Sequence, residues 1–204
     1  PVPTSEEKSL QPTSVYAISK RDQEELCLSV GRAYGIPSVA LRFFNVYGPG
    51  QAMSNPYTGV VAIFGSRLLN NKAPLIFEDG LQSRDFVHVS DIVQSLLLAL
   101  ECETANFQAF NIGSGQPRTV NEVAQALAKA LGIDVAPQVV GQYREGDIRH
   151  CFADISKAQK LLGYSPRADF DEKLKELTGW IKKQTAVDRV DDAFAELGKR
   201  GLTK

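Results

Sequence analysis

Apolar positions recur along the chain with two different spacings, which predict helices that alternate with short strands. Segments in which apolar residues return every three to four positions are predicted as helices, and these are 14–34, 58–70, 90–100, 119–131, 156–162, 170–184 and 187–199. Short runs rich in β-branched and aromatic residues are predicted as strands, and these are 38–44, 75–77, 83–89, 107–112 and 135–140. This alternation favours the α/β class.

Turn and cap residues mark the boundaries of several elements. The stretch 45–50 is expected to break the first strand sharply, because it contains four turn-forming residues. Ser90 or Asp91 is expected to cap the third helix, and Thr119 with Glu122 has the pattern of a capping box that opens the fourth.

Composition and charge exclude several classes of protein. The 204 residues are 43% hydrophobic and 23% charged, as in globular proteins, and the net charge of −1 does not favour a nucleic-acid or membrane surface. The longest apolar runs fall far short of the ~20 residues of a membrane span. Three widely spaced cysteines are expected to be reduced thiols in a cytoplasmic protein, and the two histidines have no second ligand at metal spacing.

Tyr16 and Lys20 stand four positions apart near the start of the first predicted helix, so they lie on one helical face. A free tyrosine has a pKa of about 10 and is a poor base near neutrality. A cation ~5–6 Å away favours the phenolate form by roughly 3 kcal/mol at an effective dielectric constant of ~20. A second cation is needed to complete the activation, and an oxidised nicotinamide ring is a candidate. The alternative is a pair of solvated residues on a helix surface.

Six motifs follow one another in an order that is characteristic of one family. They are Tyr16-x-x-x-Lys20, Leu41-Arg-Phe-Phe-Asn-Val-Tyr-Gly-Pro49, Ser83-Arg-Asp-Phe-Val-His-Val-Ser-Asp91, Asn111-Ile-Gly113, Arg144-Glu-Gly-Asp147 and Leu161-Leu-Gly-Tyr-Ser-Pro166. Together they resemble the extended short-chain dehydrogenase/reductase family, the NAD-dependent nucleotide-sugar epimerases and dehydratases. Within that family, the motifs are most similar to those of 4-epimerases of UDP-glucose or dTDP-L-rhamnose.

Two features of the family do not occur in these 204 residues. There is no Gly-x-x-Gly-x-x-Gly or Gly-x-Gly-x-x-Gly turn, with which family members bind the cofactor pyrophosphate. The Ser or Thr that the family places before the tyrosine would lie upstream of Pro1. We therefore expect the chain to be the C-terminal part of such an enzyme, cut out of a longer polypeptide. Its strand at 38–44 should then have an uncovered edge and leave apolar surface exposed.

The resemblance implies a fold and a division of the chain. Residues 1–47 would be the end of an NAD-binding, Rossmann-like domain, a doubly wound parallel sheet whose N-terminal strands are absent. Residues 48–204 would mainly form a smaller mixed α/β domain that binds the nucleotide sugar, with 83–115 partly returning to the Rossmann-like sheet.

Roles at the cofactor site also follow from the resemblance. Tyr16 would take the proton of the sugar 4-hydroxyl while C4 gives its hydride to NAD, and Lys20 would hydrogen-bond the nicotinamide ribose. Phe43 and Asn45 would contact the cofactor, and Asn45 also the nucleotide sugar. The alternatives are that Phe43 and Phe44 are core residues and that Asn45 caps a turn through its side chain.

The remaining predicted residues would hold the nucleotide sugar. Arg84 and Arg144 would bind its pyrophosphate through bidentate guanidinium forks, and Asp147 would accept from its ribose hydroxyls. Phe77 would line the base pocket, with a core position as the alternative. Otherwise Arg84 with Asp85, and Arg144 with Asp147, would be ordinary surface ion pairs.

The function implied by the resemblance is NAD-dependent 4-epimerisation of a nucleotide-diphosphate sugar through a 4-keto intermediate. The alternatives are a 4,6-dehydratase or reductase of the same fold and a non-catalytic NAD(P)-fold regulatory protein. The expected partners are the nucleotide sugar, the missing N-terminal half of the fold and, at full length, a second copy in a homodimer. Residues 1–204 alone are expected neither to bind NAD appreciably nor to catalyse the reaction.

Overall fold

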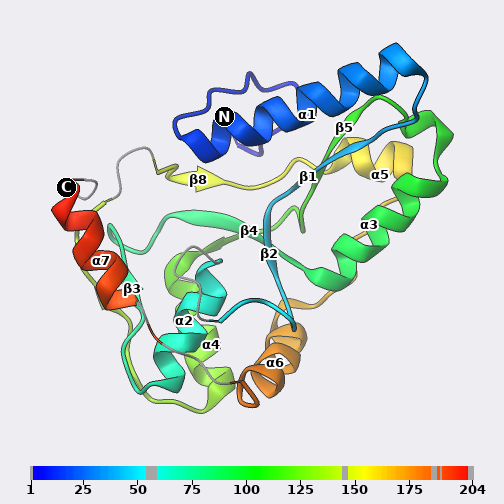
Figure 1. Cartoon of the computed structure of the whole chain (residues 1–204). Coiled ribbons are helices and arrows are strands. Elements are labelled where there is room, and N and C mark those ends of the chain that lie inside the picture. The colour runs from blue at the N-terminus through cyan, green and yellow to red at the C-terminus, as the bar shows by residue number, and fades with distance from the viewer. Residues whose placement is uncertain (1, 54–58, 144–146, 185–187, 189, 202–204) are drawn as a thin grey trace.

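The computed structural model describes residues 2–53, 59–143, 147–184, 188 and 190–201. Its helices are α1 (Val15–Tyr34), α2 (Val60–Leu69), α3 (Val89–Glu101), the 3₁₀ helix η1 (Glu103–Ala105), α4 (Val120–Leu131), α5 (Ser156–Leu162), α6 (Phe170–Ile181) and α7 (Val190–Lys199). Its strands are β1 (Ala40–Phe43), β2 (Asn45–Tyr47), β3 (Leu75–Ile76), β4 (Ser83–His88), β5 (Ala109–Ile112), β6 (Pro117–Thr119), β7 (Gln138–Val139) and β8 (His150–Cys151). Helices and strands alternate along most of the chain, which confirms the predicted α/β class (Figure 1).

β1 and β5 form a parallel pair that lies between α1 on one side and α3 with α5 on the other (Figure 1). Leu41 of β1 packs with Phe110 and Ile112 of β5 in an apolar cluster, whereas the neighbouring Arg42 contacts α1. This alternation is the two-residue period of a strand that is covered on both faces. Among the described strands, β1 pairs with β5 alone, so the edge expected to be uncovered has no strand beside it.

The chain passes from one strand pair to another at Phe44. Phe44 N donates to the carbonyl of the last residue of β5 (3.1 Å), and Asn45 then begins β2, which pairs in parallel with β4. The prediction of a sharp break from residue 45 was therefore wrong, because the extended backbone finds a second partner strand. The break comes at Gly48, where a Cβ atom would lie 2.6 Å from a side-chain carbon of α3.

β4 is the central strand of the larger sheet and pairs with three others. β2 and β8 run parallel to it, and β6 runs antiparallel. β6 and β8 were not predicted, because each is two or three residues long and lacks apolar alternation. Their extended form depends on main-chain pairing with β4, which no local pattern reveals. β3 and β7 form a separate parallel pair.

Helix ends mostly follow the predicted signals. Both hydrogen bonds of the capping box at Thr119–Glu122 are present. At α3, neither Ser90 nor Asp91 is the cap, contrary to the prediction, because His88 holds that position and its Nδ1 accepts from Ser90 N (3.2 Å). The Asp91 carboxylate is directed elsewhere and accepts from the backbone N–H groups of residues 167 and 168.

Two apolar clusters form the interior of the part of the chain that the structure describes. The first lies among α2, α4 and α6, and the second among α3, α5 and β5. Adjacent residues of β2 and β4 point into different clusters, since Tyr47 and Phe86 belong to the first while Val46 and Val87 pack in the second. These two strands therefore connect the two halves of the interior.

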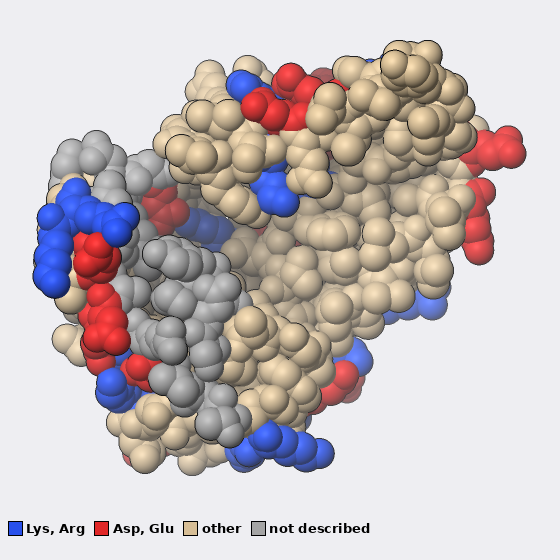
Figure 2. All heavy atoms as spheres, viewed as in Figure 1, with Lys and Arg blue, Asp and Glu red and all other residues tan. Residues whose placement is uncertain are grey.

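Large apolar side chains are exposed on α1 and α3. They are Val15, Tyr16, Ile18, Leu26, Val30 and Tyr34 on α1, and Val93, Leu96, Leu97 and Leu100 on α3. Much of the surface at the right of Figure 2, over α3 and the far end of α1, carries neither sign of charge. Phe43 of β1 is exposed as well, which confirms the prediction that apolar surface at this strand stays uncovered.

Candidate functional site

α1 brings Tyr16 and Lys20 together on one helical face, as their spacing predicts. The Lys20 ammonium lies 5.6 Å from the centroid of the Tyr16 ring and donates to Gln23 Oε1 (3.2 Å). Tyr16 is 71% exposed, so within the described part of the chain its ring remains accessible. The helix thus places the lysine cation against the tyrosine ring, on the shared face that the four-residue spacing predicts. Its catalytic role stays a prediction.

An ion pair that the sequence reasoning missed holds α1 on the sheet. Glu24 follows Lys20 by one further helical turn and accepts from Arg42 of β1 through both carboxylate oxygens (2.6 and 2.8 Å). Both side chains are largely buried, and the hydrogen bonds to Glu24 raise the pKa of Arg42. Arg42 Nη1 also donates to Glu6 O (3.2 Å), which ties the N-terminal segment to the same point. The repeated four-residue spacing of Tyr16, Lys20 and Glu24 was the available signal.

We expect Glu24→Ala to lower the free energy of unfolding of the chain by about 1.5–3 kcal/mol, because it leaves a partly buried guanidinium without its partner. Glu25→Ala is the matched control. The Glu25 carboxylate is 66% exposed and makes only a loose ion pair with Arg21, at 3.7 Å. Its loss should therefore cost less than about 1 kcal/mol of unfolding free energy. Denaturant midpoints measure both changes, and equal midpoints for the two variants would contradict the assigned role of Glu24.

Phe43 and Asn45 lie on either side of the passage from β1 to β2. Phe43 is 44% exposed, so its interpretation as a core residue is wrong. Asn45 is a strand residue that pairs with Phe86, so its interpretation as the cap of a turn is also wrong. The assignment of Phe43 and Asn45 to cofactor and substrate stays a prediction.

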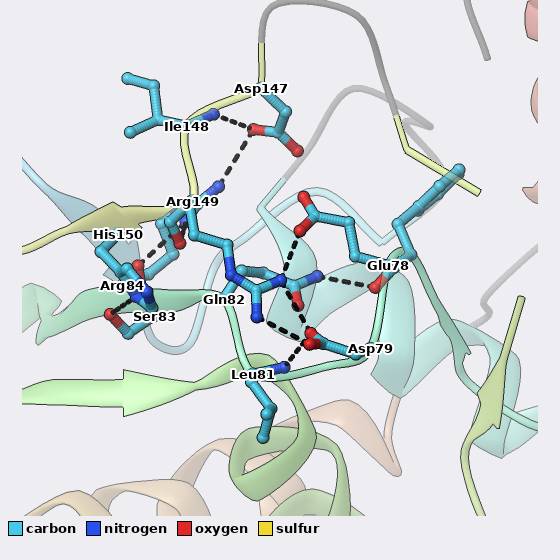
Figure 3. A network of polar contacts seen from close by, with 11 residues as sticks. Glu78, Asp79, Leu81, Gln82, Ser83, Arg84, Asp147, Ile148, Arg149 and His150 are labelled. Carbon is cyan, nitrogen blue, oxygen red and sulfur yellow. Dashed lines mark hydrogen bonds and ion pairs between the residues drawn. The ribbon is translucent and has the colours of Figure 1, made fainter. Parts of the chain in front are cut away.

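Arg84 and Asp147, assigned to the same ligand from different motifs, are in contact (Figure 3). Arg84 Nη2 lies 3.0 Å from Asp147 Oδ1, and Nη1 donates to Ser83 O (2.9 Å) and Arg149 O (3.1 Å). The interpretation of Arg84 and Asp85 as an ion pair is wrong, because adjacent strand residues point to opposite faces. Arg84 is therefore held in one orientation by three acceptors.

Asp85 is a fully buried carboxylate that organises the loop after β5, and the sequence analysis gave it no such role. It accepts from Ser114 N and Oγ (2.7 and 2.6 Å), from Gly115 N (2.9 Å) and from Ala153 N (3.1 Å). A Cβ atom at Gly113 would lie 2.4 Å from Asp85 Oδ2, which explains the glycine of the Asn-Ile-Gly motif. Four donors offset the burial of this charge, which forms no ion pair with any described residue.

The two remaining residues assigned to the nucleotide sugar are Arg144 and Phe77. Arg144 lies outside the described residues. Phe77 is half-buried just after β3, and its carbonyl accepts from Gln82 Nε2 (3.0 Å). Its assignment to a base pocket stays a prediction.

The described residues contain no group of His, Cys, Asp and Glu side chains arranged to hold a metal ion. None of the helices in this part of the chain has the length and apolarity needed to cross a membrane. The face seen in Figure 2 is hollowed between α1 and the half that contains α2 and α6, with basic and acidic side chains within the hollow.

Comparison with known sequences places these features in a family context. The sequence model described as the NAD dependent epimerase/dehydratase family matches residues 1–113. A dTDP-L-rhamnose 4-epimerase of Burkholderia thailandensis is 37% identical over 174 residues, which cover 85% of this chain and 48% of that protein. The chain spans about half the length of the curated relatives it matches.

Solved structures of similar fold carry ligands. A UDP-glucose 4-epimerase of Thermotoga maritima, solved with UDP-glucose, has a TM-score of 0.81 and 38% identity over 89% of this chain and 57% of that one. A UDP-glucuronic acid 4-epimerase of Bacillus cereus, solved with UDP-glucuronic acid and NAD, has a TM-score of 0.80 and 31% identity over 88% of this chain and 56% of that one.

Proposed function

The chain belongs to the NAD-dependent epimerase/dehydratase family, and from this we propose that it is the part of a nucleotide-sugar 4-epimerase that carries the catalytic tyrosine and most of the substrate site. The observation that carries the proposal is the contact between Arg84 and Asp147, which are 63 residues apart in sequence. It joins a cation suited to phosphate with a carboxylate suited to ribose hydroxyls. A UDP sugar, the ligand of two similar structures, has both groups.

Arg84 has an open edge for the pyrophosphate. Within the described residues, its Nη1 is taken by two carbonyls and its Nη2 by Asp147, while its Nε has no acceptor. Nη2 carries a second N–H besides the one donated to Asp147, so Nε and Nη2 can together form a fork that binds two phosphate oxygens. Arg144, three positions before Asp147, would add a second cation, and Asn45 and Phe77 would contact the sugar and the base.

The residues present fit the nicotinamide end of NAD. Lys20 Nζ has three donors, of which one is used by Gln23 among the described residues, so donors remain for ribose hydroxyls. Phe43 is partly exposed at the carboxyl end of β1, where α/β folds bind ligands. When bound, NAD would supply the acceptor and donor of the hydride at the sugar C4. Tyr16 would take the 4-hydroxyl proton and return it after the 4-keto sugar has turned over.

The division into residues 1–47 for NAD and mainly 48–204 for the nucleotide sugar, with 83–115 shared, belongs to the same proposal. The exposed apolar side chains of α1 and the open edge of β1 would pack against the N-terminal half of the fold. We also include in this proposal a homodimer at full length and a cytoplasmic location.

The test is an assay of the full-length polypeptide that contains this chain. With NAD and a UDP or dTDP sugar, NMR should show the two C4 epimers approaching equilibrium without net reduction of NAD. Loss of water from the sugar, or stoichiometric NADH, would contradict epimerisation.

Calorimetric titration of NAD into residues 1–204 should give no appreciable heat, because no Gly-rich turn is present. Tight, stoichiometric binding would place the cofactor site within this chain.

A further inference from the structure

Arg149 joins the two segments that carry the proposed phosphate and ribose ligands (Figure 3). Its guanidinium forms a bidentate pair with Asp79 (Nη1–Oδ1 2.8 Å, Nη2–Oδ2 2.7 Å) and also donates to Glu78 Oε2. Its carbonyl accepts from Arg84 Nη1 and from Ser83 N, both at 3.1 Å. One residue thus holds the turn before β4 with its side chain and holds Arg84 with its backbone.

The turn that Arg149 holds has an unusual backbone. Glu78 has a φ of +53°, a left-handed conformation that is uncommon for residues other than glycine. Its N–H donates to Gln142 O (2.7 Å), and Asp79 Oδ1 also accepts from Leu81 N (2.9 Å). Hydrogen bonding to Arg149 lowers the pKa of Asp79 to about 2, so the pair stays ionised throughout the neutral range. The contacts with Arg149 therefore oppose relaxation of this turn.

These contacts are suited to positioning and contribute little to global stability. The side chain of Arg149 is 41% exposed and that of Asp79 is 52% exposed. Exposed ion pairs of this kind typically contribute less than about 1 kcal/mol. Glu78, Asp79 and Arg149 also lie outside both apolar clusters. Loss of the Arg149 side chain should release the turn from the segment at 147–149 while the interior remains packed.

We propose that Arg149 is a positioning residue of the nucleotide-sugar site. It fixes the turn at 78–80 against the segment at 147–149, so that Arg84 and Asp147 meet the pyrophosphate and the ribose of the same nucleoside diphosphate. The inference rests on the proposed function. It adds a residue that does not itself touch the ligand and whose removal changes affinity through Arg84.

The test compares the chain with Arg149→Ala, Arg149→Lys and a control, Arg200→Ala. Arg200 makes an exposed pair with Glu196 in the C-terminal region (2.8 Å). Calorimetry with UDP and with dTDP should show roughly 10- to 100-fold weaker binding for Arg149→Ala, the loss expected when a charge-assisted hydrogen bond to phosphate can no longer form. Arg149→Lys should recover part of the loss, because it keeps the charge without the bidentate fork. Arg200→Ala should bind as the unmodified chain does.

Two further readouts separate positioning from a structural role. Amide hydrogen exchange in Arg149→Ala should accelerate at Glu78, Leu81, Ser83 and Ile148, while the amides of α4 and α6 keep their protection. In the full-length enzyme, KM for the nucleotide sugar should rise and kcat should stay nearly constant.

The outcomes separate the positioning role of Arg149 from the proposed function. Unchanged nucleoside-diphosphate affinity in Arg149→Ala would overturn the positioning role and leave the proposed function standing. Unchanged exchange at the four amides would overturn it as well. An unmodified chain that binds neither UDP nor dTDP would overturn the proposed function, and this inference with it.

Discussion

Tyr16→Phe should lower the turnover of a nucleotide sugar by ~10²–10⁴-fold in the full-length enzyme, because a phenyl ring cannot take the proton of the 4-hydroxyl. The loss of one hydroxyl should leave α1 intact, since the Tyr16 side chain is largely exposed and the helix is capped by Ser14. KM for the nucleotide sugar should therefore change little. Chromatographic separation of the two C4 epimers measures the rate.

Tyr34→Phe is the control for this prediction. Tyr34 lies at the other end of the same helix and is 77% exposed, so its hydroxyl loss matches that of Tyr16 in chemistry and exposure. Turnover of Tyr34→Phe should equal that of the unmodified enzyme. Near-normal turnover of Tyr16→Phe would show that Tyr16 is not the base.

Arg84→Ala should weaken nucleoside-diphosphate binding roughly 10- to 150-fold. A charge-assisted hydrogen bond to phosphate contributes about 1.5–3 kcal/mol, and each 1.4 kcal/mol corresponds to a tenfold change in affinity. Arg144→Ala should have a similar effect if both cations hold the pyrophosphate. The affinity of the full-length enzyme for NAD should stay unchanged, since neither arginine is assigned to the cofactor. Calorimetry measures both ligands.

Arg118→Ala separates the loss of a phosphate ligand from damage to β4. Arg118 lies opposite Arg84 in the pairing of β4 with β6, but its guanidinium is 4.1 Å from the centroid of the Phe170 ring. Its removal should lower stability through the lost cation–π contact while UDP affinity is kept. Unchanged UDP affinity in both Arg84→Ala and Arg144→Ala would rule out the arginine clamp.

Features of the fold that depend on neighbouring residues were predictable from the sequence. The capping box that opens α4 and the end of α1 at residue 34 are decided within one helical turn, and both were predicted correctly. The contact of Arg84 with Asp147 was implied by assigning both to one ligand. It did not follow from any local pattern, because 63 residues separate them.

Features that depend on partners far along the chain were missed or wrong. β6 and β8 are extended only because β4 offers main-chain partners. The pair that sequence adjacency suggested for Arg84 is not formed, since Asp85 points away from it and accepts from buried N–H and hydroxyl donors. The link between Glu24 and Arg42 also requires knowing that α1 lies over β1.

The parallel pairing of β1 with β5 has a consequence for synthesis on the ribosome. Ala109, the partner of Ala40, is translated roughly 70 residues after it. At about 5–20 residues per second, β1 waits several seconds for its partner strand. Contacts between such distant residues also slow folding after release, because the long loop between them must close first. During this interval the edge of β1 that later pairs with β5 has no partner strand, so we expect residues 40–43 to be a site for aggregation or chaperone binding before the fold is complete.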